Sequence, residues 1–425
     1  MQKGWKKVGL GLIAMGLCLT LIFTGAMPQR VLGAPTEKAV KAGIITAFTG
    51  ALATSAAPAG RGWLDCIRYA NEQGGINGIK IEAYWEDYRS LAGRAIECYH
   101  RLRQKGILVG NVVEEGALHS FLARVFRDEI PFLYIPGATS PGIQHKPQWV
   151  VGSGPMGENI MVGAALWIKE NWAEERPVKI GALSADMPIH RSAYSVAGEY
   201  MIEQGIEWVG VEFSPIVGVL DFSVELLRLA NKGADWLLIS HYGANGALIA
   251  KDAARLGLKE KINFVGDVAA LDEGVLRVAG KSAEGFYKQC MQPTVFMTEG
   301  NPGLKTVLEA AKRYRGGDPE DITMFYITGW HAAMITIQGI RLAIEQVGFE
   351  NLTGRAIRDG LFSIKDFDTG LGLPDTITEE DAYYDDDWYY GRVEKGKYVP
   401  VTGWHRPPRI FRYVVTDGEV RVERR

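Results

Sequence analysis

The sequence of 425 residues is poor in the side chains that build metal centres. It contains four cysteines and seven histidines, and no group of them has the spacing of metal ligands. It also lacks the G-x-S-x-G segment that positions a nucleophilic serine in many hydrolases. We therefore expect neither a metal site nor a serine hydrolase.

The chain likewise has no excess of positive charge. Its 47 lysines and arginines face 50 aspartates and glutamates, and four of the basic residues lie within residues 1–34. Without that segment, 43 basic and 50 acidic residues remain, a net charge of −7. A protein with no basic field is not expected to bind nucleic acid or an anionic membrane surface.

The amino terminus has the layout of an export signal. Three lysines among the first seven residues precede an apolar run over residues 8–23, and small residues follow it. This order is typical of a secretory signal peptide. We predict such a peptide over residues 1–34, with cleavage between residues 26 and 34. An uncleaved membrane anchor is the alternative, although the apolar run is short for a spanning helix.

Cysteine pairing is limited by number. Cys66, Cys98 and Cys290 remain after removal of the leader, so at most one disulfide forms. An oxidising compartment would permit a bridge between Cys66 and Cys98, which both lie in predicted helices, and the sequence leaves that pairing open.

Short apolar segments alternate with amphipathic ones along two series. The predicted strands are residues 40–48, 79–87, 107–110 and 131–135, then 178–184, 206–213, 234–240 and 262–266. Strands that alternate with helices at this spacing form parallel sheets with right-handed crossovers. The sequence therefore predicts an α/β fold with two doubly wound parallel-sheet lobes. Helices over 301–315 and 322–346 and hairpins over 391–401 and 412–422 follow.

In doubly wound sheets, ligands bind beyond the carboxyl ends of the strands. The loops at those ends are residues 48–57, 111–116, 136–140, 186–191, 240–245 and 267–271. In "PGATSP" (136–141), prolines bracket small residues whose backbone N–H groups a ligand can approach. A tight turn that needs proline and glycine only for its geometry is the alternative.

Four segments resemble the branched-chain amino acid (Leu/Ile/Val) binding proteins of ABC importers, which are periplasmic proteins with the type I fold. The segments are "TGALATSAAPAGRGWLDCIRYANEQGGING" (49–78), "YIPGATSP" (134–141), "FDTGLGLP" (367–374) and "GKYVPVTGW" (396–404). Their order and spacing match from about residue 40 to about residue 404.

The resemblance implies two lobes that are joined by three crossovers and close on a small-molecule ligand. Lobe 1 would contain residues 35–152 and 290–362, and lobe 2 residues 153–289 and 363–425. The closed form would then dock on a membrane permease. We expect the protein to be a monomer and to reside in the periplasm. A receptor that feeds a sensory system, with the same lobes, is an alternative.

The resemblance also implies ligand contacts. Gly137 and Ala138 would offer backbone groups and Thr139 its hydroxyl. Tyr242 occupies a position where the family often has an aromatic residue that closes the site from lobe 2. Ser55 occupies a position after the first strand where the family often has an aromatic or polar residue that contacts the ligand.

Two positions depart from the family pattern. Glu114 or Glu115 stands where the family has a serine that binds the ligand carboxylate, and Asp267 lies one place from the family's acidic residue. Two like charges about 4 Å apart repel by several kcal/mol at intermediate dielectric. Glu114 therefore points away, is protonated, or meets a ligand that is not a simple α-amino acid, such as an amide or a cation. Alternatively, the two glutamates merely favour the start of a helix at residue 116.

Other functional classes have weaker support. "GSGPMG" (152–157) fits the dinucleotide-binding pattern G-x-G-x-x-G, so that a secreted NAD-dependent oxidoreductase is an alternative. Pro155 within the turn and the export signal argue against it, and we expect no cofactor and no catalytic residue. His190 lies on a loop that faces the cleft, where we expect it to contact the ligand.

Three consecutive aspartates, Asp385, Asp386 and Asp387, stand in "YYDDDWYY" (383–390). Successive residues of a strand face opposite sides, so these side chains cannot easily converge on one metal ion. We predict a solvated surface turn.

Overall fold

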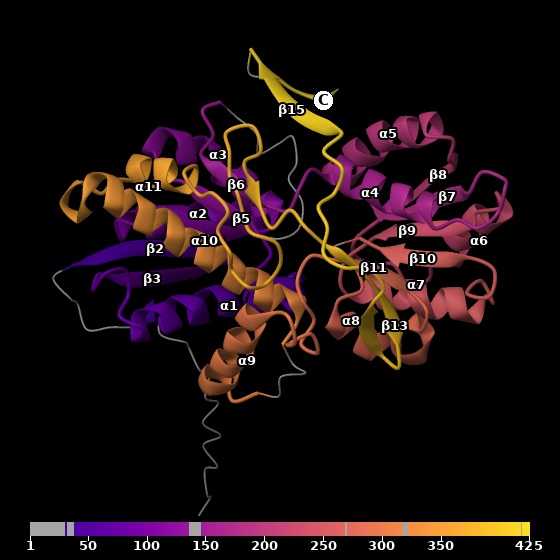
Figure 1. The fold of residues 1–425 in the computed structure, drawn as a ribbon, viewed down its shortest axis with the longest axis horizontal. Helices are drawn as coiled ribbons and strands as arrows, with labels where there is room; N and C mark the ends of the chain where they lie inside the picture. The colour runs from indigo at the N-terminus through magenta and orange to yellow at the C-terminus, as the bar shows by residue number, and fades with distance from the viewer. Residues whose placement is uncertain (1–29, 32–37, 136–145, 268–269, 318–321, 418) are drawn as a thin grey trace, which may run out of the picture.

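The structure, a computed structural model, describes residues 30–31, 38–135, 146–267, 270–317, 322–417 and 419–425. The chain forms two α/β lobes side by side, with a hairpin at the carboxyl terminus (Figure 1). The predicted signal peptide lies outside the described residues except for residues 30–31. Among the described helices, none is long and apolar enough to cross a membrane.

The first lobe is built on a seven-stranded sheet in which only the edge strand β1 is antiparallel. In spatial order its strands are β1 (Arg30–Val31), β3 (Lys80–Asp87), β2 (Ala39–Thr46), β4 (Val109–Val113), β5 (Phe132–Ile135), β6 (Val150–Ser153) and β12 (Tyr383–Tyr384). Its helices are α1 (Ala53–Glu72), α2 (Ala92–Gln104), α3 (Glu115–Asp128), α9 (Pro302–Arg315), α10 (Met324–Val347), η4 (Phe349–Asn351) and α11 (Gly354–Leu361).

The second lobe has a seven-stranded sheet with a parallel centre and an antiparallel edge. In spatial order its strands are β14 (Lys397–Pro400), β13 (Tyr389–Glu394), β11 (Tyr287–Cys290), β10 (Asn263–Gly266), β9 (Trp236–Ser240), β7 (Lys179–Ala185) and β8 (Glu207–Ser214). Its helices are α4 (Gly157–Glu170), α5 (Pro188–Glu203), α6 (Ser223–Asn231), α7 (Ala244–Arg255), α8 (Glu273–Ala279) and η2 (Gly280–Ala283). The predicted pair of doubly wound lobes is confirmed.

The chain crosses between the sheets three times. β6 leads to α4, β11 leads to α9, and β12 leads to β13. The third crossover lies further along the chain than the sequence predicts. Residues 363–384 were expected in lobe 2, but Ile364, Leu371 and Ile377 are buried in the core of lobe 1, and β12 pairs with β6 there. The reason is apolar burial, which keeps this segment on the first lobe until Tyr384.

The first of these crossovers contains the glycine-rich segment 152–157. β6 ends in the first sheet and α4 begins on the second lobe. A dinucleotide-binding fingerprint instead joins a strand to a helix within one βαβ unit. The segment is therefore a connection between lobes in this fold.

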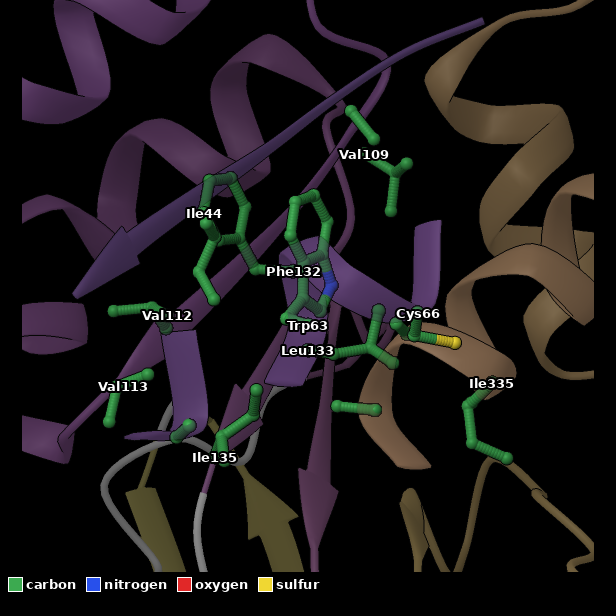
Figure 2. Packing of buried hydrophobic residues seen from close by; sticks show 14 of the residues in the cluster. Ile44, Trp63, Cys66, Val109, Val112, Val113, Phe132, Leu133, Ile135 and Ile335 are labelled. Carbon is green, nitrogen blue, oxygen red and sulfur yellow. The ribbon is translucent and has the colours of Figure 1, made fainter. Parts of the chain in front are cut away.

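Each lobe has its own apolar core. In the first lobe Trp63 of α1, Phe132 of β5 and Ile335 of α10 are completely buried, and the α-helices cover the sheet with such side chains (Figure 2). Cys66, Cys98 and Cys290 are buried free thiols, so Cys66 and Cys98 are not bridged. Burial raises the pKa of the Cys98 thiol to about 11, which keeps it protonated at neutral pH.

The helices α1 and α10 pack closely because glycines lie at their contact. A Cβ atom on Gly329 would lie 1.9 Å from the carbonyl oxygen of Ala59. We expect Gly329→Ala to lower the free energy of unfolding by about 1–3 kcal/mol, since the helices must move apart. Gly93→Ala in α2 is the control, because a Cβ there meets nothing within 4 Å, and it should not destabilise. Urea denaturation of both variants measures the difference, and equal stabilities would contradict the argument.

Both hairpins near the carboxyl terminus are present. β13 pairs with β14, and β15 (Phe411–Thr416) pairs with β16 (Glu419–Arg424). The second hairpin, for which the sequence suggested no role, is fixed to lobe 2. Asn159 of α4 accepts backbone hydrogen bonds from Ile410 and Phe411, and the Tyr413 hydroxyl donates to Glu158.

Candidate ligand-binding site

A pocket of about 140 Å³ lies between the lobes. Strand ends of both sheets contribute to it, as expected for doubly wound sheets. From lobe 1 it is lined by Leu52, Tyr88, Ser90, Ala92, Glu114, Gly116 and Ala117, and from lobe 2 by Met187, Ile216 and Tyr242. A ligand in this pocket therefore touches both lobes at once.

Among the described residues that line the pocket, Glu114 is the one with an ionisable carboxyl group. It lies between β4 and α3 with a φ of 82°, a left-handed conformation that costs a non-glycine residue of order 1–3 kcal/mol. Its backbone N–H donates to the carbonyl of Ile135 at 2.9 Å, which holds the turn in place. Burial, and next the charge of Glu115, raise the pKa of Glu114 to about 7. The side chain therefore changes its charge near neutral pH.

Tyr88 was missed by the sequence analysis. It follows β3 directly, at one more carboxyl end of a strand, and that position alone could have identified it. The residue is 2% exposed, and its hydroxyl has no hydrogen-bond partner in the described part of the chain. Since buried hydroxyls are nearly always paired, this oxygen is suited to a ligand or to a bound water.

Tyr242 closes the pocket from lobe 2 and is held by His190. Their rings are parallel, with centroids 5.6 Å apart, and the Tyr242 hydroxyl is 3.2 Å from Nε2 of His190. Nδ1 of His190 is 2.9 Å from the Ser184 hydroxyl and 3.2 Å from the carbonyl of Ala185, so both ring nitrogens have hydrogen-bond partners. Burial lowers the pKa of His190, against the raising effect of Asp267.

A second histidine supports the same loop. His241 is completely buried, and its Nδ1 accepts from the backbone N–H of Tyr242 and from Asn245. Its Nε2 therefore donates to the Ser214 hydroxyl at 3.0 Å. Burial, and next the neighbouring His190, lower the pKa of His241 to about 4. The imidazole is neutral under ordinary conditions and fixes the direction of Tyr242.

His190 and the remaining predicted contacts do not line this pocket or fall outside the described residues. The Ser55 hydroxyl donates to the carbonyl of Leu52 at 3.1 Å, within the first turn of α1. Asp267 accepts from the backbone N–H of Ala270 at 2.9 Å. Burial, and next the charge of Asp267, raise the pKa of Tyr242, so Asp267 acts on the pocket through its charge. Gly137, Ala138 and Thr139 lie in residues 136–145, outside the described part.

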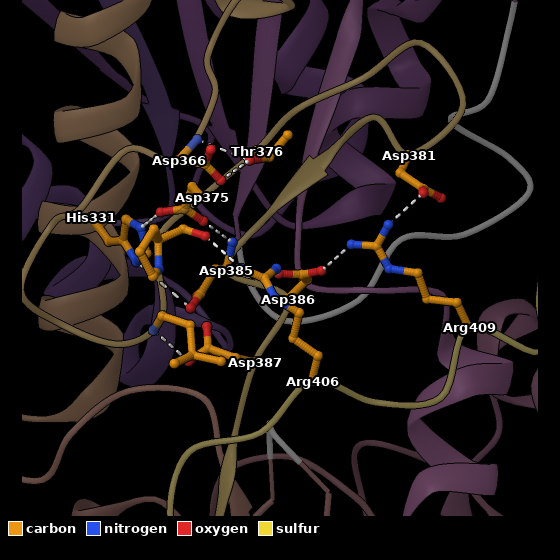
Figure 3. A network of polar contacts seen from close by, with 12 residues as sticks. His331, Asp366, Asp375, Thr376, Asp381, Asp385, Asp386, Asp387, Arg406 and Arg409 are labelled. Atoms are coloured by element: carbon orange, nitrogen blue, oxygen red, sulfur yellow. Dashed lines mark hydrogen bonds and ion pairs between the residues drawn. The ribbon is translucent and has the colours of Figure 1, made fainter.

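The prediction of a solvated turn at residues 385–387 is wrong. Asp385, Asp386 and Asp387 are 1%, 5% and 2% exposed. Each has its own partners (Figure 3). Asp385 accepts from Gln292 at 2.7 Å, Asp386 pairs with Arg406 and Arg409, and Asp387 accepts from the backbone N–H of Leu373. In the described residues no group of acidic, histidine or cysteine side chains could hold a metal ion.

Comparison with known proteins places this architecture among solute-binding proteins. The family model described as "Periplasmic binding protein" matches residues 39–397. The leucine-, isoleucine-, valine-, threonine-, and alanine-binding protein of Pseudomonas aeruginosa is 23% identical over 326 residues, which are 72% of this chain and 82% of that protein.

Solved structures share the fold. A branched-chain amino acid ABC transporter protein of Thermus thermophilus with bound valine superposes with a TM-score of 0.77 at 21% identity, over 88% of this chain and 97% of that chain. A fatty acid ABC transporter substrate-binding protein of Thermomonospora curvata gives 0.73 at 21% identity, over 88% and 93%. The resemblance to the binding proteins of ABC importers is confirmed, and the fold is the type I fold. Because the family model spans most of its length, the chain belongs to the periplasmic binding protein family.

Proposed function

We propose that this chain is an extracytoplasmic solute receptor that binds a small amide or amine between its lobes and delivers it to the permease of an ABC importer. One observation carries the ligand class: Glu114 lines a pocket that no lysine or arginine of the described residues lines. Residues 136–145, which follow β5 in the sequence, contain no lysine or arginine either. A ligand carboxylate would meet a like charge there without a cation to offset it.

An N–H donor suits the pocket better. A ligand amide or ammonium group can donate to Glu114, and hydrogen bonds to a charged acceptor are about twice as strong as neutral ones. The Tyr88 hydroxyl offers a second polar contact, and the side chains of Leu52, Met187 and Ile216 surround an apolar part. A volume of about 140 Å³ supports a ligand of few heavy atoms, such as a short aliphatic amide, urea or a small amine.

The proposed cycle follows from the lining. The ligand first contacts Glu114 and Tyr88 on lobe 1, and Tyr242 then closes over it from lobe 2. Closure around the ligand shifts the population towards one arrangement of the lobes, which the permease recognises. The apolar leader supports export to the periplasm. We propose that the protein acts as a monomer and binds its ligand without changing it.

A thermal-shift screen of the purified chain without residues 1–34 tests this proposal. The panel contains aliphatic amides, urea, polyamines, amino acids, small carboxylates and NAD. A ligand at a hundred times its dissociation constant adds about 2.7 kcal/mol of stability. We expect a shift from amides or amines, with the compound recovered unchanged. A shift from NAD alone, or recovery of an altered compound, would indicate an enzyme and overturn the proposal.

The unpaired hydroxyl of Tyr88 gives a separate prediction. We expect Tyr88→Phe to weaken binding of that amide or amine by about 0.5–1.5 kcal/mol, because one neutral hydrogen bond to the ligand is lost. The melting temperature of the free protein should not fall, since no partner among the described residues loses a bond.

Tyr99→Phe is the matched control for this measurement. The Tyr99 hydroxyl donates to Asp128 at 2.9 Å, and neither residue lines the pocket. That variant should lose stability and keep its affinity. Calorimetric titration and thermal melts of both proteins separate the two effects. A Tyr88→Phe protein that melts earlier and binds as before would place the hydroxyl in the structural framework alone.

A further inference from the structure

A second and larger pocket lies on the first lobe, away from the cleft. It has a volume of about 670 Å³ and is bounded by α1, α9, α10 and residues 367–369. We call it the rear pocket. Its residues are Cys66, Tyr69, Ala70, Gln73, Gly75, Gly303, Thr306, Trp330, Met334, Ile337, Gln338, Arg341, Phe367 and Thr369. None of them lines the pocket between the lobes.

The rear pocket lies beside the contact between α1 and α10, and both helices contribute to its lining. The two helices touch at Gly62 and Gly329, where an added Cβ would lie 1.9 Å from a backbone oxygen of the other helix. Beside this contact the rings of Tyr69 and Trp330 pack against each other, with centroids 5.7 Å apart, and both residues line the rear pocket. The lining residues of α10 recur at helical spacing, from Trp330 to Arg341.

The charge of the rear pocket is unbalanced. Among the described residues, Arg341 is the one charged side chain that lines it, and none of the lining side chains is acidic. The Nε atom of Arg341 is buried and makes no hydrogen bond in the described part of the chain. Arginines on neighbouring surfaces are paired, as Arg315 is with Asp65 and Arg313 with Glu72. A buried guanidinium nitrogen without an acceptor is costly, so an anionic partner would stabilise it.

We propose that the rear pocket binds an organic carboxylate with an apolar body. A carboxylate can accept two parallel N–H bonds from one guanidinium, and Arg341 is the arginine that lines the rear pocket. Trp330, Tyr69 and Phe367 provide the aromatic walls that cover an acyl or aryl group. The volume lies in the range of small-molecule sites. The site is independent of the cleft, where Glu114 disfavours an anion.

Decanoate, below the concentration at which it forms micelles, is the probe for this site. We expect calorimetric titration of the exported chain to detect binding of decanoate, with decan-1-ol at least tenfold weaker because it lacks the charge. Arg341→Gln should weaken decanoate binding about tenfold or more, and Thr306→Trp should block the pocket. Lys305→Gln is the control, an exposed charge on α9 that does not line the pocket, and it should bind as the original chain does.

The same titrations on Tyr242→Ala locate the bound decanoate. Unchanged binding in Tyr242→Ala with a loss in Arg341→Gln supports the rear pocket. Loss in Tyr242→Ala but not in Arg341→Gln would place decanoate in the cleft and overturn the proposal. Absence of binding, or equal affinity for decan-1-ol, would overturn it as well. If Thr306→Trp does not fold, Arg341→Gln, with a thermal melt to verify its structure, still decides the question.

Discussion

Replacement of Glu114 by glutamine is expected to weaken binding of the amide or amine ligand about tenfold or more. The change keeps the size of the side chain and removes its charge, and hydrogen bonds to charged groups contribute about 1.5–3 kcal/mol. Because glutamine is not glycine either, the strain at a φ of 82° stays the same in both proteins. The difference in affinity therefore reports the charge.

The raised pKa of Glu114 predicts how the affinity for the ligand changes with pH. Burial and Glu115 raise the pKa of Glu114 to about 7, so its charged fraction increases between pH 6 and pH 8. Affinity for an N–H donor should increase over that interval in the original chain and stay flat in Glu114→Gln. Calorimetric titrations at pH 6, 7 and 8 measure this.

Glu115→Gln is the control for the Glu114 experiment, because Glu115 does not line the pocket. It should keep the affinity and move the rise to slightly lower pH, since one neighbouring negative charge is gone. An affinity that falls with pH in the original chain would mean that Glu114 donates its proton to the ligand, and the proposed ligand class would be wrong.

The architecture of this protein can be predicted from its sequence more reliably than the burial of its charged residues. The alternation of strands and helices predicted both lobes, and the rule for doubly wound sheets brought Glu114 and Tyr242, 128 residues apart, to one pocket. These inferences succeed because periodicity and strand direction are local properties. Tyr88 obeys the same rule and could have been included.

Burial of a charged residue depends on partners that are distant in the chain. Asp386 is buried because Arg406 and Arg409 reach it, and Asp385 because Gln292 and His331 do. The run of three aspartates gives no hint of these partners, so that a solvated turn was the reasonable prediction and was wrong. The rear pocket depends similarly on the close contact of α1 and α10, which no local pattern reveals.

The buried aspartates lie where all three crossovers meet. Asp385 stands between β12 and β13, Gln292 follows β11, and Ser153 ends β6 and donates to Asp385 at 3.4 Å. His331 of α10 completes this crossover cluster, with Nε2 2.7 Å from Asp375 and Nδ1 3.6 Å from Asp385 (Figure 3). The three crossovers between the lobes are therefore tied together by one ionic network.

Removal of one partner from the crossover cluster should cost more stability than any other single change discussed. We expect Asp375→Ala to lower the free energy of unfolding by about 3–5 kcal/mol, because it leaves the buried His331 without its nearest carboxylate. Asp368→Ala is the control, an exposed aspartate in the same segment. Urea denaturation measures both, and similar values for the two variants would contradict the assignment.

The crossover cluster also predicts how stability changes with pH. Burial alone would lower the pKa of His331, but Asp375 and Asp385 raise it to about 9. The folded chain therefore holds this proton more tightly than the unfolded chain, whose histidine has a pKa near 6.5. The stability that results is fully present below pH 6.5 and is lost as the pH rises through 9. A rise from 6.5 to about 9 corresponds to about 3 kcal/mol.

The raised pKa values of Asp385 and Asp387 change the stability with pH in the same direction as that of His331. Burial raises the pKa of Asp385 to about 7, against His331, and burial with Asp385 raises that of Asp387 to about 8. Each aspartate therefore binds its proton more tightly in the folded chain than in the unfolded chain. Its contribution to the free energy of unfolding is fully present only below the pKa of the unfolded chain, and it is lost as the pH rises through the pKa of the folded chain. The free energy of unfolding should fall between pH 6 and pH 9, and fall less in His331→Gln. His119→Gln, an exposed histidine on α3, should follow the original chain. If His331→Gln has the same pH profile as the original chain, His331 does not carry the proton, and the ionic description of the crossovers fails.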